Sequence, residues 1–183
     1  MRIVAGKARG HHLLGPRSSN IRPTADRVRE AIFNVLGQWM DGWSVLDLFA
    51  GTGALALESI SRGARRAVMV DEDKEAVRLC RTNAAALGFK EQVEILAMPV
   101  TRALAQLQRA GERFELIFAD PPYGLRTSAQ LLEAVASAGL LTKEGIFCLE
   151  HDKREKAPPD YPGLPRTDQR RFGDTVVSIY RVA

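Results

Sequence analysis

Apolar runs and helical segments alternate without interruption between residues 44 and 150, and this order leaves few folds open. The apolar runs have the length of buried strands, and the segments between them have helical spacing. Strand and helix in strict alternation predict βαβ units, and therefore an α/β fold with a parallel sheet covered by helices on both faces. The predicted strands are VLDLF, AVMVD, EILAM, ELIFAD and IFCLE, and the predicted helices span 54–63, 73–87, 100–110 and 128–139.

The two ends of the chain have other patterns. Residues 1–22 contain short apolar pieces around Gly6 and Gly10, typical of a hairpin or of extended arms outside the core. Residues 23–36 have helical spacing, with Pro23 at the first helical position. The closing RRFGDTVVSIYRV alternates as a strand paired in a hairpin does. We therefore expect a basic N-terminal arm or hairpin over residues 1–22 and one domain over residues 23–183.

Composition excludes several classes of protein. With 45% hydrophobic and 26% charged residues, the 183-residue chain is unlike disordered, collagen-like or disulfide-scaffold proteins. No run approaches the roughly 18 apolar residues of a membrane span, and the N-terminus lacks the apolar core of a signal peptide, so we expect a cytoplasmic protein. Cys80 and Cys148 are too few for a metal cluster or a disulfide framework. They are predicted to be buried, reduced thiols, and no metal is expected.

Positive charge is concentrated in two parts of a chain whose net charge is +4. A solvated surface is the simplest interpretation of any single basic run. Two such regions beside an ordinary domain instead favour a nucleic-acid partner. The second region contains Arg166, Arg170 and Arg171. The nucleic-acid-binding residues predicted in the first region are Arg2, Lys7, Arg9, Arg17 and Arg22.

The first candidate site is VLDLFAGTGALALE, where a strand runs through a glycine turn into a helix. Glycines let the backbone approach a ligand closely at the carboxyl edge of a sheet. No lysine follows them as in a phosphate-binding loop, and the third glycine of the dinucleotide motif is absent. Asp47 lies in an apolar strand, where a carboxylate needs donors or a cationic ligand group, and Asp71 ends the next strand, where it can accept from ribose hydroxyls. The pattern predicts a positively charged nucleoside cofactor without pyrophosphate, an ordinary tight turn being the alternative.

The second candidate site is Asp120-Pro121-Pro122-Tyr123, directly after an apolar strand. The prolines fix φ and remove two donors, which leaves rigid carbonyl acceptors. Asp120 adds an acceptor, and Tyr123 adds a flat face. Acceptors and an aromatic plane without a nucleophile suit a planar base that carries an exocyclic amine, a stiff surface loop in which Tyr123 only packs being the alternative.

Together, VLDLFAGTGALALE, Asp71 and DPPY resemble S-adenosylmethionine-dependent methyltransferases that act on amino groups. IRPTADRVREAIFN, the opening MRIVAGKARG and the late FGDT resemble, more narrowly, the RsmD family of bacterial small-subunit ribosomal RNA guanine-N2 methyltransferases. This resemblance covers nearly the whole chain. It implies a Rossmann-like class I methyltransferase fold with a mostly parallel, seven-stranded sheet and a small N-terminal extension.

The resemblance also implies roles for individual residues. Asp120, Pro121, Pro122 and Tyr123 become the catalytic, target-base motif. The family often has Asp or Asn near an Ala after the third strand, to meet the adenine of the cofactor, and here Pro99 stands there. Backbone groups or apolar walls around Met98 would then hold the adenine. The cofactor-binding residues predicted in this way are Asp47, Phe49, Ala50, Gly51, Thr52, Gly53, Asp71 and Thr24.

The implied partner is 16S ribosomal RNA, free or within an assembling small-subunit particle, and the implied enzyme is a monomer. Two other functions remain open. A DNA adenine-N6 methyltransferase shares DPPY but ordinarily needs a target-recognition segment, and a non-catalytic nucleic-acid-binding protein could keep the fold without the chemistry. Arg27 and Glu30 also have two interpretations, an intrahelical pair or a role beside the cofactor.

Overall fold

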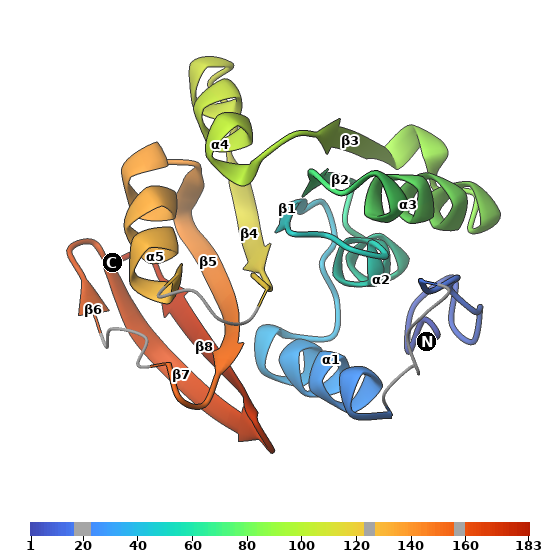
Figure 1. Cartoon of the computed structure of the whole chain (residues 1–183), viewed down its shortest axis with the longest axis horizontal. Helices are drawn as coiled ribbons and strands as arrows, with labels where there is room; N and C mark the ends of the chain where they lie inside the picture. Colours follow the sequence, from blue (N-terminus) through green and yellow to red (C-terminus); the bar gives the residue numbers. More distant parts are fainter. Residues whose placement is uncertain (17–22, 123–126, 156–159) are drawn as a thin grey trace.

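The structure, a computed structural model, describes residues 1–16, 23–122, 127–155 and 160–183 (Figure 1), without the side chains of residues 23–26 and 127. Its elements follow the chain in the order α1 (Pro23–Leu36), β1 (Ser44–Leu48), α2 (Ala54–Ser61), β2 (Arg66–Asp71), α3 (Lys74–Ala86), η1 (Lys90–Gln92), β3 (Val93–Ala97), α4 (Val100–Arg109), β4 (Phe114–Ala119), α5 (Thr127–Ala138), β5 (Leu141–Asp152), β6 (Asp160–Tyr161), β7 (Leu164–Phe172) and β8 (Thr175–Arg181). Each predicted strand and helix is present. Most of them begin or end within a few residues of the predicted bounds, and β5 is longer than expected. None of these helices is long and apolar enough to cross a membrane.

The described strands form one sheet in the order β3-β2-β1-β4-β5-β8-β7-β6. The first five strands of this order pair in parallel, and β8 and β7 add an antiparallel hairpin beside β5. The two-residue β6 lies next to β7, so the sheet has one short strand more than the seven expected. Successive strands are added to one side of β1 up to β3 and to its other side from β4 onward. Open α/β sheets bind their ligands at such a switch point, here between β1 and β4.

Helices cover both faces of the sheet, and each face has its own apolar core. One core contains side chains of α1, α2 and α3 together with Val45, Phe118 and Cys148, and the other contains those of α4 and α5 together with Leu46, Ile117 and Phe147. Successive strand residues thus enter opposite cores, as the pleat requires. Both cysteines are buried and free, as predicted.

The N-terminal segment, residues 1–16, packs against the domain. It folds back on itself, with an antiparallel bridge between Arg2 and His12. Ile3, Ala8 and Leu13 are buried in the same core as α1 and α2. The expectation that these apolar pieces lie outside the core was wrong, because the face of α2 next to them offers both apolar contacts and hydrogen-bond partners.

The buried side chain of Glu58 on α2 holds this segment in place. Its carboxylate accepts hydrogen bonds from the backbone N–H groups of Val4 and Ala5, at 2.8 and 2.9 Å. Arg62 donates to the same carboxylate at 2.9 Å, and the Nε atom of Arg29 lies 3.7 Å from it. A carboxylate removed from water in this way needs such partners, and the N-terminal backbone supplies two of them.

Candidate active site

The register of the sheet gathers the predicted acidic residues at its carboxyl edge. Leu48 pairs with Val70 on one side and with Ala119 on the other, so β1, β2 and β4 end at the same level. Asp71 is the last residue of β2, and Asp120 directly follows β4. Asp47 is the second-last residue of β1. The structure therefore brings together residues that are more than 70 positions apart in the sequence.

The turn after β1 is held in a left-handed conformation at three positions, with φ of 64° at Phe49, 56° at Gly51 and 79° at Gly53. Ala50 donates a backbone hydrogen bond to the Val70 carbonyl at 3.0 Å, which joins the turn to β2. A Cβ atom at Gly53 would lie 2.8 Å from the sulfur of Met69, so this glycine is required by packing. At Gly51 the nearest atom to such a Cβ is 4.0 Å away. Gly51 therefore faces open space at the sheet edge, where a ligand can approach the backbone.

We predict that Gly51→Val blocks cofactor binding, because its side chain projects into this space. Gly88, at the far end of α3, is a matched control: its φ is 72°, and a Cβ there meets nothing within 4 Å. Both substitutions carry the strain of a left-handed β-branched residue, roughly 1–3 kcal/mol. Calorimetric titration should show normal affinity for S-adenosylmethionine in Gly88→Val and at least a tenfold loss in Gly51→Val. Equal affinities would remove this loop from the cofactor site.

Asp47 is a buried carboxylic acid with only partial compensation for its burial. The backbone N–H of Ala56, at the start of α2, donates to it at 3.1 Å. Loss of hydration on burial is the main cause that raises the pKa of Asp47 to about 7. The hydrogen bond from Ala56 lowers this pKa, and the nearby carboxylates of Asp120 and Asp71 raise it further. A ligand that brings positive charge would favour the ionised form, so the site fits the sulfonium and amino groups of the predicted cofactor.

The raised pKa of Asp47 has a consequence for stability. Between the unfolded value of 3.8 and the folded value of about 7, the folded protein holds a proton that the unfolded chain releases, so stability falls as pH rises through this range. Asp47→Asn should therefore raise the free energy of unfolding of the unliganded protein by up to about 4 kcal/mol at pH 8 and have little effect at pH 4. Urea unfolding at the two pH values tests this. Equal effects at both would refute the charge-based explanation.

Asp71 lies at the end of β2 beside the glycine turn. Its Oδ2 accepts from the backbone N–H of Gly51, and its Oδ1 accepts from that of Asp73, both at 2.9 Å. Each oxygen keeps a further lone pair for a ribose hydroxyl. Met98 follows β3, whose Ala97 pairs with Asp71, so the predicted adenine wall adjoins the predicted ribose acid.

Asp120 and Pro121 directly follow β4. Asp120 is accessible to solvent, while Pro121 is buried and Pro122 is exposed. Loss of hydration around the carboxyl group raises the pKa of Asp120. Tyr123, the last residue of this motif, lies outside the described residues.

Glu150 is a functional candidate that the sequence analysis missed. Ala119 pairs with Leu149, so Glu150 stands beside Asp120 on the neighbouring strand β5, at a strand separation of about 4.8 Å. Residues 118 and 148 point into the same core, so the side chains of Asp120 and Glu150 share one face of the sheet. Burial and the negative charge of Asp120 both raise the pKa of Glu150. An acid directly after the apolar run IFCL was the signal in the sequence.

Thr52 of the glycine turn is linked to the N-terminal segment through Asn83 on α3. The buried Asn83 side chain accepts from the backbone N–H of Leu14 at 2.8 Å and donates to its carbonyl at 3.0 Å. It also donates to the carbonyl of Thr52 at 2.9 Å. The N-terminal segment is therefore part of the support of the predicted cofactor loop. The side chain of Thr24, also predicted at the cofactor, is not among those described.

The predicted nucleic-acid-binding residues are distributed over two places. Arg2 and Arg9 are exposed and line a groove of about 360 Å³ with Arg27 and Glu30. Lys7 is also exposed, but its Nζ donates to Gln92 at 3.0 Å and lies 4.6 Å from the ring centre of Phe89. The prediction for Arg17 and Arg22 falls outside the described residues.

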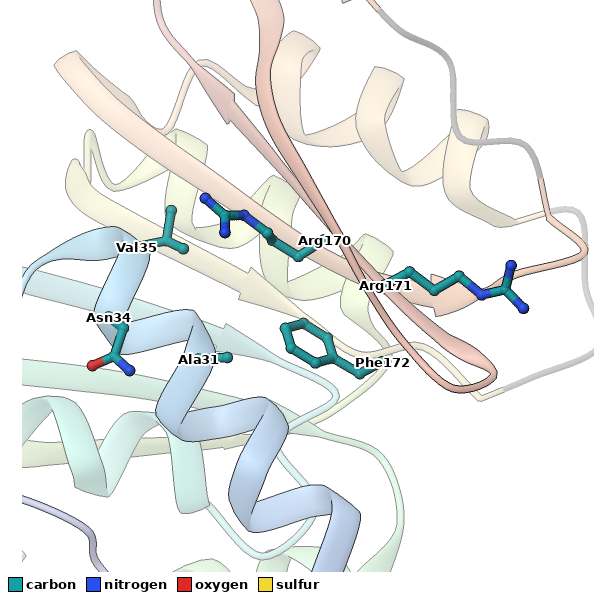
Figure 2. A pocket seen from close by; sticks show the side chains of 6 residues that line it. All are labelled: Ala31, Asn34, Val35, Arg170, Arg171 and Phe172. Atoms are coloured by element: carbon teal, nitrogen blue, oxygen red, sulfur yellow. The ribbon is translucent and has the colours of Figure 1, made fainter.

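A second groove, of about 480 Å³, lies between α1 and the end of β7. Figure 2 shows its residues: the ring of Phe172 faces Ala31, Arg170 extends toward Val35, and Arg171 points away from α1. Arg170 and Arg171 belong to the second basic region of the sequence.

Comparison with known proteins agrees with this fold and site. Residues 1–181 match the family described as conserved hypothetical protein 95. The chain is 33% identical to a putative rRNA methyltransferase of Bacillus subtilis, over 99% of this chain and 98% of that protein. It is 32% identical to the ribosomal RNA small subunit methyltransferase D of Escherichia coli K12, over 86% and 78% of the two chains.

The solved structure of a putative methyltransferase from Escherichia coli superposes with a TM-score of 0.87 at 28% identity, covering 100% of this chain and 97% of that one. The fold is thus the class I methyltransferase fold that the sequence predicted, with antiparallel strands at its carboxyl end. The chain belongs to the conserved hypothetical protein 95 family, and the RsmD-like assignment made from its motifs is confirmed.

Proposed function

We propose that this protein methylates the exocyclic N2 of a guanine in small-subunit ribosomal RNA. S-adenosylmethionine is the cofactor, as expected for a methyltransferase of this family. When bound, it supplies an electrophilic methyl group on a positively charged sulfur. In this proposal Asp71 holds the ribose, Met98 borders the adenine, and the backbone at Gly51 allows close approach.

Asp120 and the Pro121 carbonyl act on the target nitrogen. The lone pair of an exocyclic amine is delocalised into the base, so the nitrogen is a poor nucleophile. Hydrogen bonds from its two N–H groups to Asp120 and to the Pro121 carbonyl favour a pyramidal nitrogen, and they strengthen as positive charge develops there. As the N–CH3 bond forms and the S–CH3 bond breaks, the nitrogen releases one proton. The carboxylate of Asp120 can accept it, since desolvation raises the pKa of this group.

The observation that favours guanine is the second carboxylate, Glu150, beside Asp120. Guanine presents an N1–H donor next to its amine, whereas adenine presents a bare N1 acceptor next to its amine. The two N–H donors of guanine favour the ionised form of both groups, and an ionised carboxylate only accepts hydrogen bonds, so the pair matches the donor–donor edge of guanine. Adenine would place its N1 lone pair against Glu150 and would therefore require this group in its protonated form.

Base preference tests the role of Glu150. We expect Glu150→Gln to lower kcat/KM at least tenfold on RNA with guanosine at the target, because a half-buried acceptor for N1–H is weakened. The glutamine amide can donate to the bare N1 of 2-aminopurine, so the loss on RNA carrying that base should be smaller. Glu144→Gln, at the exposed start of β5, is the control. An unchanged ratio of guanine to 2-aminopurine activity in Glu150→Gln would exclude this contact.

Ribosomal RNA as the partner is supported by the named relatives, which act on that RNA. We propose that the enzyme works in the cytoplasm as a monomer, on free RNA or on an assembling particle, with the target base outside a duplex so that it can enter the site.

Transfer of isotope-labelled methyl groups to total RNA tests the substrate. The purified protein, S-adenosylmethionine and RNA from cells that lack this protein should give label at one position of small-subunit ribosomal RNA. Label only in DNA, or in no nucleic acid, would contradict the proposal.

A further inference from the structure

We propose that one exposed face of α1 forms a track for the RNA strand that flanks the target nucleotide, between the N-terminal segment and β7. This inference rests on the proposed function and specifies where that substrate binds. The two grooves described above supply the evidence, because each is bounded by α1 on one side and by arginines on the other.

The two grooves share one stripe of α1. Arg27 and Glu30 line the first, and Ala31, Asn34 and Val35 line the second. These positions recur at helical spacing, so they lie on one side of the helix. From Arg27 to Val35 the stripe extends about 12 Å at 1.5 Å per residue. Figure 1 shows α1 between the N-terminal segment and the β7–β8 hairpin, with its start near the former.

The charge of the grooves fits a polyanion. The first is lined by three arginines and one acid, and the second by Arg170 and Arg171 without an acid. Arg170 does pair with Asp168, at 3.1 Å, but the pair is exposed, and such pairs contribute little. The guanidinium has five N–H donors, of which Asp168 engages those on Nε and Nη2, so a phosphate oxygen can bind to the others.

The second groove also offers contacts for a base. Phe172 lies opposite the small Ala31 and lines this groove, so part of its half-buried ring is accessible there (Figure 2). An aromatic face stacks any base, which suits a single strand. The amide of the exposed Asn34 provides donors and an acceptor for a base edge.

The track leads to the candidate active site. Glu150 pairs with Val177 on β8, and Val177 pairs with Arg170 on β7, so Asp120, Glu150 and Arg170 occupy one row across the sheet. Directly paired residues share a face, and Val177 points into the core under α1. Arg170 therefore lies on the same face of the sheet as the two carboxylates. A strand bound along α1 would pass directly beside them.

Charge reversal at both ends of the track tests the proposal. Binding of an RNA hairpin containing the target is measured by fluorescence anisotropy without cofactor, across a range of salt concentrations. We expect Arg9→Glu and Arg170→Glu each to weaken binding about tenfold and to reduce the slope of log affinity against log salt by about one. Arg109→Glu, on α4 at the opposite face, is the matched control. The track would be refuted if Arg9→Glu and Arg170→Glu changed RNA affinity no more than Arg109→Glu does. It would also be refuted if the wild-type protein did not bind the RNA.

A second variant separates stacking from charge. Phe172→Leu keeps an apolar side chain against the core but removes the flat ring, so binding of the hairpin should fall several-fold or more with an unchanged salt slope. Unchanged affinity would remove the base from the second groove. These measurements do not depend on methyl transfer. If the protein binds RNA as described but methylates no guanine, the proposed function is refuted and the track is supported. If the protein methylates guanine N2 but the charge reversals do not change RNA binding, the proposed function is supported and the track is refuted.

Discussion

Asp120→Asn is expected to slow methyl transfer by at least about 10-fold and by up to about 1000-fold, since removal of one preorganised hydrogen-bonding group from an active site typically costs about 100- to 1000-fold. The asparagine keeps the size and one acceptor oxygen of Asp120, but its NH2 group can face the donors of the target amine, so the nitrogen loses its alignment. The substitution also removes the carboxylate that accepts the released proton. Single-turnover transfer to an RNA hairpin at saturating cofactor measures this step directly.

The same experiment has a matched control and a pH dependence. Asp41→Asn, in the exposed loop before β1 at the opposite edge of the sheet, should transfer at the wild-type rate. Because desolvation raises the pKa of Asp120, the wild-type rate should rise with pH over a range above the usual value of 3.8 for an aspartate. Full activity in Asp120→Asn would remove the carboxylate from the mechanism.

Glu58→Ala is expected to lower the free energy of unfolding by about 3–5 kcal/mol, the loss typical of breaking a buried ion pair from one side. The alanine leaves Arg62 and Arg29 buried without the carboxylate, and it leaves the N–H groups of Val4 and Ala5 without their acceptor. Urea unfolding at pH 7 measures the change, with the exposed Glu91→Ala as the control. Hydrogen exchange should also become faster at Val4 and Ala5. A loss below about 1 kcal/mol would show that the N-terminal segment does not depend on this anchor.

The central fold could be predicted because its signals are local and repeated. Each apolar run of five or six residues followed by a helical segment specifies one βα unit, and the crossover rules leave little choice for a parallel sheet. Asp47, Asp71 and Asp120 were recognisable for the same reason: an acid in or at the end of an apolar strand conflicts with its surroundings unless a ligand or a donor compensates.

The docking of the N-terminal segment could not be predicted in this way. Ile3, Ala8 and Leu13 have no helical or strand periodicity, and glycines and basic residues separate them. Glu58 is one of the anchors of this segment, and in the sequence it is an ordinary polar residue of a helix. Only the packing of the segment against α2 shows that this acid is buried and binds backbone N–H groups. Glu150 was different, since like Asp71 it follows an apolar run directly and could have been found by the same argument.

The identity of the methylated nucleoside distinguishes guanine-N2 from adenine-N6 methylation. The purified protein, S-adenosylmethionine and small-subunit ribosomal RNA are incubated, and the RNA is digested to nucleosides and analysed by mass spectrometry beside a reaction with Asp120→Asn. We expect N2-methylguanosine in the wild-type reaction and a large reduction of it in the variant. N6-methyladenosine, or no methylated nucleoside from the wild-type protein, would contradict this expectation.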